Sequence, residues 1–153
     1  AVDLDTNSKA ILRALQSAAT LSANALAQRL TMSSTTVWRR IQDMEQAGVF
    51  SARAAVLNPE KLGLEVCVLI EVNIKSQDAE SRQSFEQFAQ TDERITQCFS
   101  LTGQHDYVIV AYARSIKDFE AFLMNSLLAH PSVESSNASL VLNRVKNSTA
   151  LPI

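Results

Sequence analysis

Polar side chains that can bind DNA gather at the start of a predicted helix near the N-terminus. Four hydroxyl residues, Ser33 to Thr36, lead into two adjacent arginines, Arg39 and Arg40. A helix that enters the major groove contacts bases and phosphates with short polar side chains in its first turn and with arginines one turn later. The pattern therefore predicts a DNA-recognition helix over residues 33–47, with Ser33 as its N-cap.

The predicted DNA contacts come from this helix and from the segment that follows it. They are Ser34, Thr35, Thr36, Trp38, Arg39, Arg40 and Arg53. Three of them have a competing interpretation that involves no DNA. Arg40 could pair with Glu45, Trp38 could be partly buried against the domain, and Arg53 could be a solvated charge.

Two further helices must support the recognition helix. Asp5 or Asp3 can cap a helix over residues 5–17, and Ser22 can cap another that runs to Leu30. Apolar residues recur at helical spacing in all three segments, which predicts a shared core. We expect a helix-turn-helix domain over residues 1–58, in which residues 49–57 form a short strand or wing.

The hydrophobic period changes after residue 63, and residues 59–63 are predicted to be a hinge. Alternating apolar residues predict strands, and apolar stripes predict helices, one of them capped by Ser115. The strands are expected at residues 66–74, 95–101, 106–113 and 133–145, and the helices at residues 79–90 and 116–127. The order β-α-β-β-α-β is that of a ferredoxin-like domain over residues 64–153. The fold class is therefore α+β.

Several predicted strands are apolar on both faces. Residues 107–112 contain almost no polar side chain, and Cys67 and Leu69 lie opposite the face formed by Val66 and Ile70. Helices can cover only one face of such a sheet, and soluble monomers rarely expose a large apolar patch. We therefore expect the other face to pack against the sheet of an identical chain.

Charge is divided unevenly along the chain. The net charge is −2, but residues 1–58 carry six basic and four acidic groups, so the excess of negative charge lies in the second domain. Affinity for DNA grows with the number of phosphates neutralised, so two or more copies must act together. We find no membrane span or signal peptide and expect a cytoplasmic protein. Cys67 and Cys98 are predicted to be free, buried cysteines.

The chain resembles transcriptional regulators of the leucine-responsive regulatory protein (Lrp/AsnC) family. The matching stretches are residues 4–16, 21–50, 54–64, 101–110 and 141–153. The resemblance implies an N-terminal domain that binds double-stranded DNA and a C-terminal ferredoxin-like domain that dimerises sheet to sheet and senses a small amino acid. It also implies assembly of dimers into larger oligomers, often octamers. Relatives often have glycine where this chain has Thr31, and positive φ there would strain a threonine.

The connection between the second and third predicted strands is the candidate effector site. Taken alone, it could be a tight turn in which Asp106 bonds its own backbone, or a loop in which Asp106 receives an α-ammonium group. The resemblance implies an effector pocket at a dimer interface that involves this loop and the last strand. The candidate residues are Thr102, Gly103, Gln104, His105, Asp106, Tyr107, Ser135, Ser136, Asn137 and Ala138.

These features favour a transcriptional regulator that responds to an amino acid. The alternative is an architectural protein that compacts DNA without a small-molecule effector. An enzyme is not expected, because the sequence shows no nucleophile–base pair, no paired loop carboxylates and no glycine-rich phosphate loop. His105 and His130 do not stand at metal-ligand spacing from the cysteines, so neither a metal nor a cofactor is expected.

Overall fold

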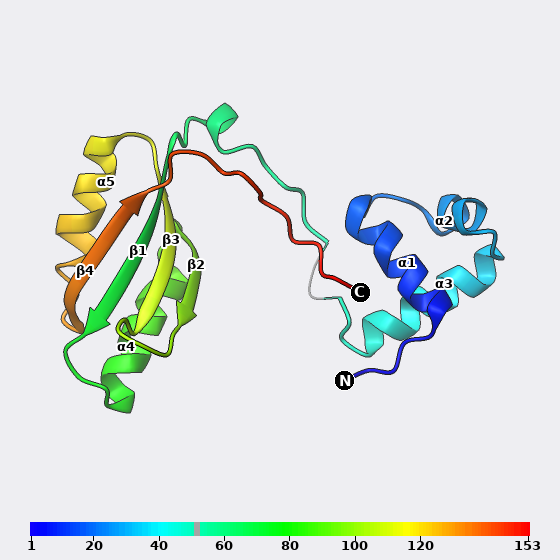
Figure 1. The fold of residues 1–153 in the computed structure, drawn as a ribbon, viewed down its shortest axis with the longest axis horizontal. Helices are drawn as coiled ribbons and strands as arrows, with labels where there is room; N and C mark the ends of the chain where they lie inside the picture. Colours follow the sequence, from blue (N-terminus) through cyan, green and yellow to red (C-terminus); the bar gives the residue numbers. More distant parts are fainter. Residues whose placement is uncertain (51–52) are drawn as a thin grey trace. The chain divides into compact units, whose positions relative to one another are not determined.

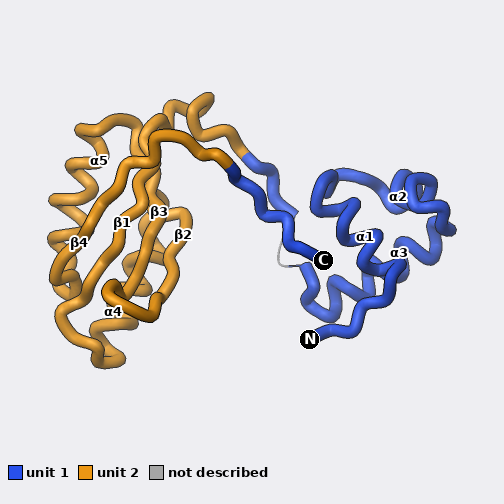
Figure 2. The backbone as a smooth tube through the Cα atoms, viewed as in Figure 1, with its two compact units in different colours: residues 1–56, 146–153 blue, residues 57–145 orange. Residues whose placement is uncertain are grey.

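The computed structural model describes residues 1–50 and 53–153, which form two compact units (Figure 1). The N-terminal unit comprises residues 1–56 and 146–153, and the sheet unit comprises residues 57–145 (Figure 2). The chain therefore passes between the units twice. Residues 146–153, which were expected in the second domain, group with the N-terminal unit.

Three short helices form the N-terminal unit, as predicted. They are α1 (Thr6–Ser17), α2 (Ala23–Leu30) and α3 (Ser34–Gln46). Each begins after a side chain that accepts a hydrogen bond from the backbone N–H three residues later; these N-caps are Asp5, Ser22 and Ser33. Because caps satisfy N–H groups that have no partner within the helix, they set where each helix begins.

The core of the N-terminal unit takes one fully buried side chain from each helix: Ile11, Leu26 and Val37. Between α2 and α3, Thr31 adopts the left-handed conformation, with φ 55° and ψ 49°. The turn therefore needs the positive φ for which relatives often use glycine. A β-branched residue held there carries about 1–3 kcal/mol of strain.

The predicted wing is not a strand in the part of the chain that the structure describes. Residues 49–50 and 53–57 are irregular, and residues 51–52 of the predicted wing lie outside the described residues. A strand needs a partner for its ladder of hydrogen bonds. The four described strands all pair with one another in the sheet unit.

The sheet unit has the predicted βαββαβ order. Its elements are β1 (Val66–Ile74), α4 (Ala79–Thr91), β2 (Ile95–Ser100), β3 (Tyr107–Ala113), α5 (Ile116–Phe122) and β4 (Val133–Leu140). A 3₁₀ turn, η1 (Glu60–Leu62), precedes β1, and α5 continues as a π-helical segment, η2 (Leu123–Leu127). The strands are antiparallel in the order β2-β3-β1-β4, with α4 and α5 on one face (Figure 1).

β4 is shorter than the predicted strand over residues 133–145. It ends at Leu140, which pairs with Val68, because β1 begins only two residues earlier, at Val66. The irregularity expected near Asn137 lies earlier in β4, where the register shifts opposite the Asn73–Ile74 step. The loss of its partner strand thus sets the end of β4.

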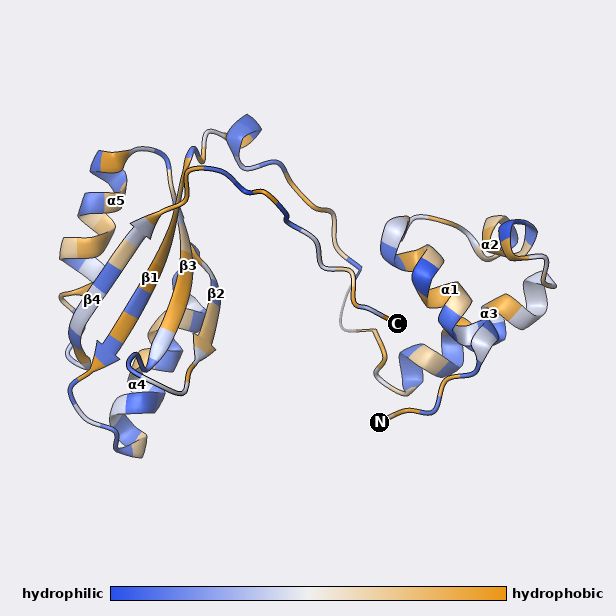
Figure 3. Ribbon diagram, in the orientation of Figure 1, coloured by the Kyte–Doolittle hydropathy of each residue, from blue (hydrophilic) through white to orange (hydrophobic). Residues whose placement is uncertain are grey.

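The sheet unit buries one face of the sheet and leaves the other open. Val68, Ile70 and Val72 of β1 are fully buried against α4 and α5, where they meet Phe85 and Phe122. The opposite face, which we call the open face, carries Leu69, Phe99, Val108, Val110 and Tyr112. Apolar residues therefore run along β3 and the first part of β1, whereas Glu71 and Asn73 make the end of β1 polar on this face. In Figure 3, β1 shows blue bands between its orange segments. Leu69 remains 43% exposed and Phe99 51% exposed in the single chain.

Candidate DNA-binding surface and effector site

The outward side of α3 is the candidate DNA-binding surface. Val37, Ile41 and Met44 face the core. With 100° between successive residues, the opposite side carries Thr35, Trp38, Arg39, Gln42 and Gln46. Trp38 is 58% exposed, so more than half of its side chain is open to a partner.

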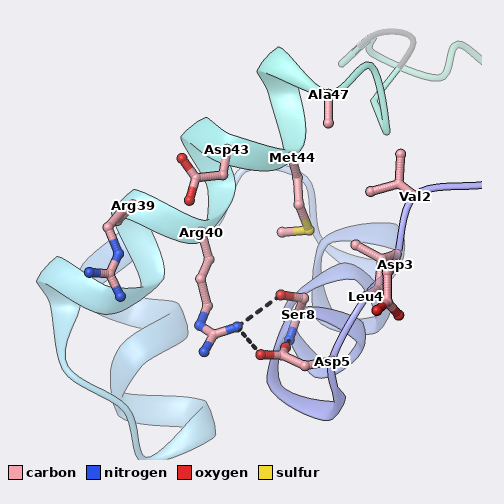
Figure 4. Close-up of a pocket in the computed structure, with 10 residues that line it drawn as sticks. All are labelled: Val2, Asp3, Leu4, Asp5, Ser8, Arg39, Arg40, Asp43, Met44 and Ala47. Atoms are coloured by element: carbon pink, nitrogen blue, oxygen red, sulfur yellow. Dashed lines mark hydrogen bonds and ion pairs between the residues drawn. The ribbon is translucent and has the colours of Figure 1, made fainter.

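The two adjacent arginines of α3 have different surroundings. Arg40 turns toward α1, where its Nη1 lies 2.5 Å from Asp5 Oδ2 and 3.0 Å from Ser8 Oγ (Figure 4). Arg39 is exposed, points away from this cluster, and makes no hydrogen bond or ion pair within the described residues. Arg40 therefore ties α3 to α1, and Arg39 is the guanidinium available to a partner. Glu45, the expected alternative partner of Arg40, instead pairs with Arg53.

The Asp5–Arg40 pair borders an open cleft of about 540 Å³ between the N-terminal segment and α3. The Arg40 guanidinium and the backbone N–H of Ser8 lower the pKa of the Asp5 carboxyl from 3.8 to about 2. Hydrogen bonds to the charged form of a carboxyl favour its ionisation. Asp5 is thus both the N-cap of α1 and the anion that orients Arg40.

We predict a pH-dependent loss of stability that depends on Asp5. A carboxyl whose pKa is lower in the folded state stabilises the fold above its unfolded pKa, and this contribution disappears as the pH falls through the folded value. The N-terminal unit should therefore lose stability between pH 4 and pH 2. In Asp5→Asn that part of the profile should be flat, whereas Asp3→Asn should retain the wild-type profile. Thermal melts by circular dichroism at each pH measure this, and identical profiles for both variants would contradict it.

Two other predicted DNA contacts serve local structure. Thr36 accepts a hydrogen bond from Ser33 Oγ at 2.7 Å, which makes it part of the N-cap of α3. Arg53 lies 2.6 Å from Glu45 and stacks on the ring of Phe50. Ser34, Thr35 and Arg39 remain as exposed polar candidates, together with Trp38.

Gln42 and Gln46 were not among the predicted contacts. Thr35, Arg39, Gln42 and Gln46 follow the spacing i, i+4, i+7 and i+11, so they line one stripe of α3. A glutamine can pair with the N6 and N7 atoms of adenine, as an arginine can with the O6 and N7 atoms of guanine. The predicted contacts on this helix ended at Arg40. The same helical spacing, continued to the end of the helix, could have found both glutamines from the sequence.

The candidate effector loop is more tightly bonded than the sequence indicated. Asp106 accepts hydrogen bonds from the Ile74 N–H and from Gln77 Nε2, one on each carboxylate oxygen, both at 2.9 Å. Its own N–H is bonded to Val72 and Asn73. Asp106 thus ties the loop to the end of β1, and its carboxylate is engaged within the chain.

Tyr107 belongs to the core and not to an open pocket. It is 1% exposed and packs on the ring of Phe85, with 4.7 Å between the ring centroids. Its hydroxyl donates to Glu86 Oε1 at 2.9 Å, and burial together with this carboxylate raises the pKa of Tyr107 to about 12. The alternation along β3 puts it on the helix side of the sheet, so we remove it from the effector candidates.

The remaining effector candidates divide between the two faces of the sheet. Ser135 and Asn137 of β4 lie on the open face, opposite Asn73 and Glu71 of β1. Glu71 also pairs with His105, with 2.8 Å between Oε2 and Nε2. Ser136 and Ala138 lie on the helix side, and Thr102, Gly103 and Gln104 are exposed in the loop, where Gly103 has φ 108°. The structure therefore gathers His105, Ser135 and Asn137 at the polar end of the open face.

The cysteines are free but less buried than predicted. Cys67 is half-buried on the open face, and Cys98 is exposed at the edge strand β2. Desolvation and the nearby Glu86 raise the pKa of Cys98. Among residues 1–50 and 53–153, no cluster of three or more His, Cys, Asp or Glu side chains could hold a metal ion. Over the same residues, no helix is both long and apolar enough to span a membrane.

Two family models match the chain. The Lrp/AsnC ligand-binding domain matches residues 67–151, which is more than half of the chain, and a winged helix-turn-helix DNA-binding model matches residues 4–50. The second match contains all of α1, α2 and α3, and the first contains all four strands except the start of β1.

Known proteins resemble the chain along its whole length. The transcriptional regulator AzlB of Bacillus subtilis is 29% identical over 98% of this chain and 96% of its own. A transcriptional regulator of Neisseria meningitidis, solved in complex with L-methionine, is 31% identical with a TM-score of 0.94 over 98% of this chain and 97% of its own. Escherichia coli AsnC is 25% identical with a TM-score of 0.89, over 99% of this chain and all of its own. The chain therefore belongs to the Lrp/AsnC family of DNA-binding transcriptional regulators.

Proposed function

We propose that the chain is a sequence-specific regulator that reads the major groove with the outward side of α3. The observation that carries this proposal is the contrast between the two arginines. Arg40 is held by Asp5 and Ser8, whereas Arg39 is exposed beside Thr35 and Gln42. Arg39 and Gln42 are about 4.5 Å apart along the helix axis, close to the rise of about 3.4 Å between base pairs, so they can reach neighbouring bases.

Two substitutions on α3 should separate affinity from base discrimination. Arg39→Ala should weaken binding to duplexes selected from a random library by about 10–100-fold, since a bidentate arginine–guanine pair is worth roughly 1–3 kcal/mol. Gln42→Ala should relax discrimination at one A·T pair while preserving the rest of the site. Fluorescence anisotropy against duplexes with single base changes measures both effects.

The matched control is Gln90→Ala, an exposed glutamine on α4 of the sheet unit. It should bind every duplex as the wild type does. Binding by all variants should also weaken steeply as salt rises, because phosphate contacts release counterions. Unchanged affinity and base preference in both α3 variants would contradict the proposed surface.

We further propose that the regulator assembles through its open face and responds to a small amino acid. Packing two open faces together would cover Leu69 and Phe99, which a single chain leaves exposed. Dimers are then expected to assemble further, up to an octamer. The L-methionine complex of the Neisseria meningitidis relative supports an amino acid as the class of effector.

The effector is proposed to bind between C-terminal domains of the assembly, at the loop of residues 102–106 and the open-face residues of β4. Because Asp106 is engaged within its own chain, backbone N–H groups and residues such as Ser135 and Asn137 become the candidate contacts. Such a site needs a neighbouring subunit to complete it. The ligand must favour one arrangement of subunits over another if it is to change DNA binding.

Thermal-shift screening with the twenty amino acids tests the effector proposal. A ligand that binds only the folded protein at about 100 times its dissociation constant stabilises it by roughly 2.7 kcal/mol, so a hit should raise the melting temperature by several degrees. Asn137→Ala should reduce that shift, and Gln90→Ala should not. If no amino acid changes the melting temperature, the oligomer size or the DNA affinity, an architectural DNA-compacting role is the better account.

A further inference from the structure

The C-terminal segment is bound to α1 through its main chain. Gln16 Nε2 donates to the Leu151 carbonyl at 3.1 Å, and the Leu151 N–H donates back to Gln16 Oε1. Arg13, one helical turn earlier, donates from Nε to the Ile153 main-chain oxygen at 2.7 Å. Arg13 and Gln16 share one face of α1, away from the core residues Ile11 and Leu15.

The hydrogen bonds that hold the segment use its main-chain atoms. Leu151 is 69% exposed, so its side chain contributes little burial, whereas Ile153 is 40% exposed and partly covered. Hydrogen bonds between exposed groups contribute modestly, which makes the docking reversible. Covalent attachment to the rest of the chain nevertheless keeps the local concentration of the segment high.

The preceding residues are bound to the sheet unit. The Val141 N–H donates to the Cys67 carbonyl at 2.9 Å, and Arg144 donates from Nη1 to the Tyr112 hydroxyl at 3.0 Å. Arg144 also stacks on the Tyr112 ring. Only six residues, 145–150, separate Arg144 from Leu151. The seven steps from the Cα of Arg144 to the Cα of Leu151 can span at most about 25 Å, at roughly 3.6 Å per step.

We propose that residues 141–153 form a strap that restrains the N-terminal unit, with the Arg13–Gln16 face of α1 as its docking surface. Apart from the strap, the chain crosses from one unit to the other at residues 56–57. With it, each copy of the chain holds its α3 within a limited range of positions. In an oligomer, two α3 helices bind two DNA half-sites together. The restraint therefore reduces the range of distances between half-sites that the oligomer can bind.

Substitutions at Leu151 distinguish the strap from an incidental contact. Leu151→Pro removes the N–H that donates a hydrogen bond to Gln16 Oε1. Leu151→Ala keeps that N–H and only shortens an exposed side chain. Gln16→Ala removes the same contact from the α1 side. The strap should therefore release in Leu151→Pro and Gln16→Ala and remain docked in Leu151→Ala.

Pulsed electron paramagnetic resonance on the full chain measures the restraint. Spin labels are placed on the exposed native Cys98 and on Asn24→Cys of α2, in a Cys67→Ser background. The labelled chain is mixed with a tenfold excess of unlabelled chain, so that an oligomer rarely holds two labelled copies. The measured distance is then the one between the two labels of a single chain. We expect a narrow distance distribution in the wild type and Leu151→Ala, and a broad one in Leu151→Pro and Gln16→Ala.

Hydrogen exchange provides a second measurement in the unlabelled protein. The Leu151 amide should exchange about fivefold more slowly in the wild type than in Gln16→Ala, as a single modest hydrogen bond predicts. A broad distribution in the wild type, or equal widths in all four proteins, would overturn the strap. Neither measurement uses DNA or an effector, so both are independent of the proposed ligand response.

Discussion

Leu69→Asp should convert the assembled protein into monomers. Leu69 lies near the centre of the open face, beside Val110 of β3, and is 43% exposed in the single chain. Packing against a second sheet would bury the new carboxylate without a partner. A buried, unpaired charge costs at least about 3 kcal/mol, which raises the dissociation constant more than a hundredfold. Sedimentation equilibrium at micromolar concentration measures the shift.

Ile116→Asp is the matched control for this substitution. Ile116 is also an exposed apolar residue, at 56%, but it is the first residue of α5, on the other side of the sheet. A carboxylate at a helix N-terminus is favourable, so the fold should tolerate it. This variant should remain at least dimeric. A Leu69→Asp protein that stays dimeric would show that the open face is not the interface.

Phe85→Ala should be the most destabilising single truncation that we consider. The Phe85 side chain is fully buried between α4 and the sheet and contacts the rings of Phe88 and Tyr107. Its removal leaves a cavity in a close-packed core, and such truncations cost about 3–5 kcal/mol. The melting temperature of the sheet unit should therefore fall by more than ten degrees, since about 1 kcal/mol shifts a domain of this size by roughly 4–8 °C.

Two further truncations show whether the loss is local. Leu142→Ala removes a side chain that is 97% exposed and should leave the melt unchanged. Val37→Ala removes a fully buried methyl pair from α3 and should lower the stability of the N-terminal unit alone. Calorimetry with hydrogen exchange assigns each loss to its unit. If Phe85→Ala destabilised the N-terminal unit equally, the two cores would not be separate.

Patterns within a short stretch of sequence predicted most of the elements. Ser33 capped α3 as expected, because a capping bond joins residues only three apart. The alternation around Leu69 predicted apolar side chains on both faces of this strand, and Leu69 does lie on the face that the helices leave uncovered. The strand considered for residues 49–57 is absent from the described part of that segment, because a strand also requires a partner that local sequence does not reveal.

Contacts between residues far apart in the sequence decided which candidate side chains are available to bind DNA or an effector. Arg39 and Arg40 carry the same signal in sequence, yet only Arg40 meets Asp5, 35 residues away. Likewise, the hydroxyl of Tyr107 is bonded to Glu86, which removes it from the candidate effector site. The sequence by itself determined the helices, the strands and their apolar sides, because periodicity and capping act between near neighbours. Only the tertiary structure decided which polar groups are already paired and where the C-terminal segment docks, because those partners are brought together by folding.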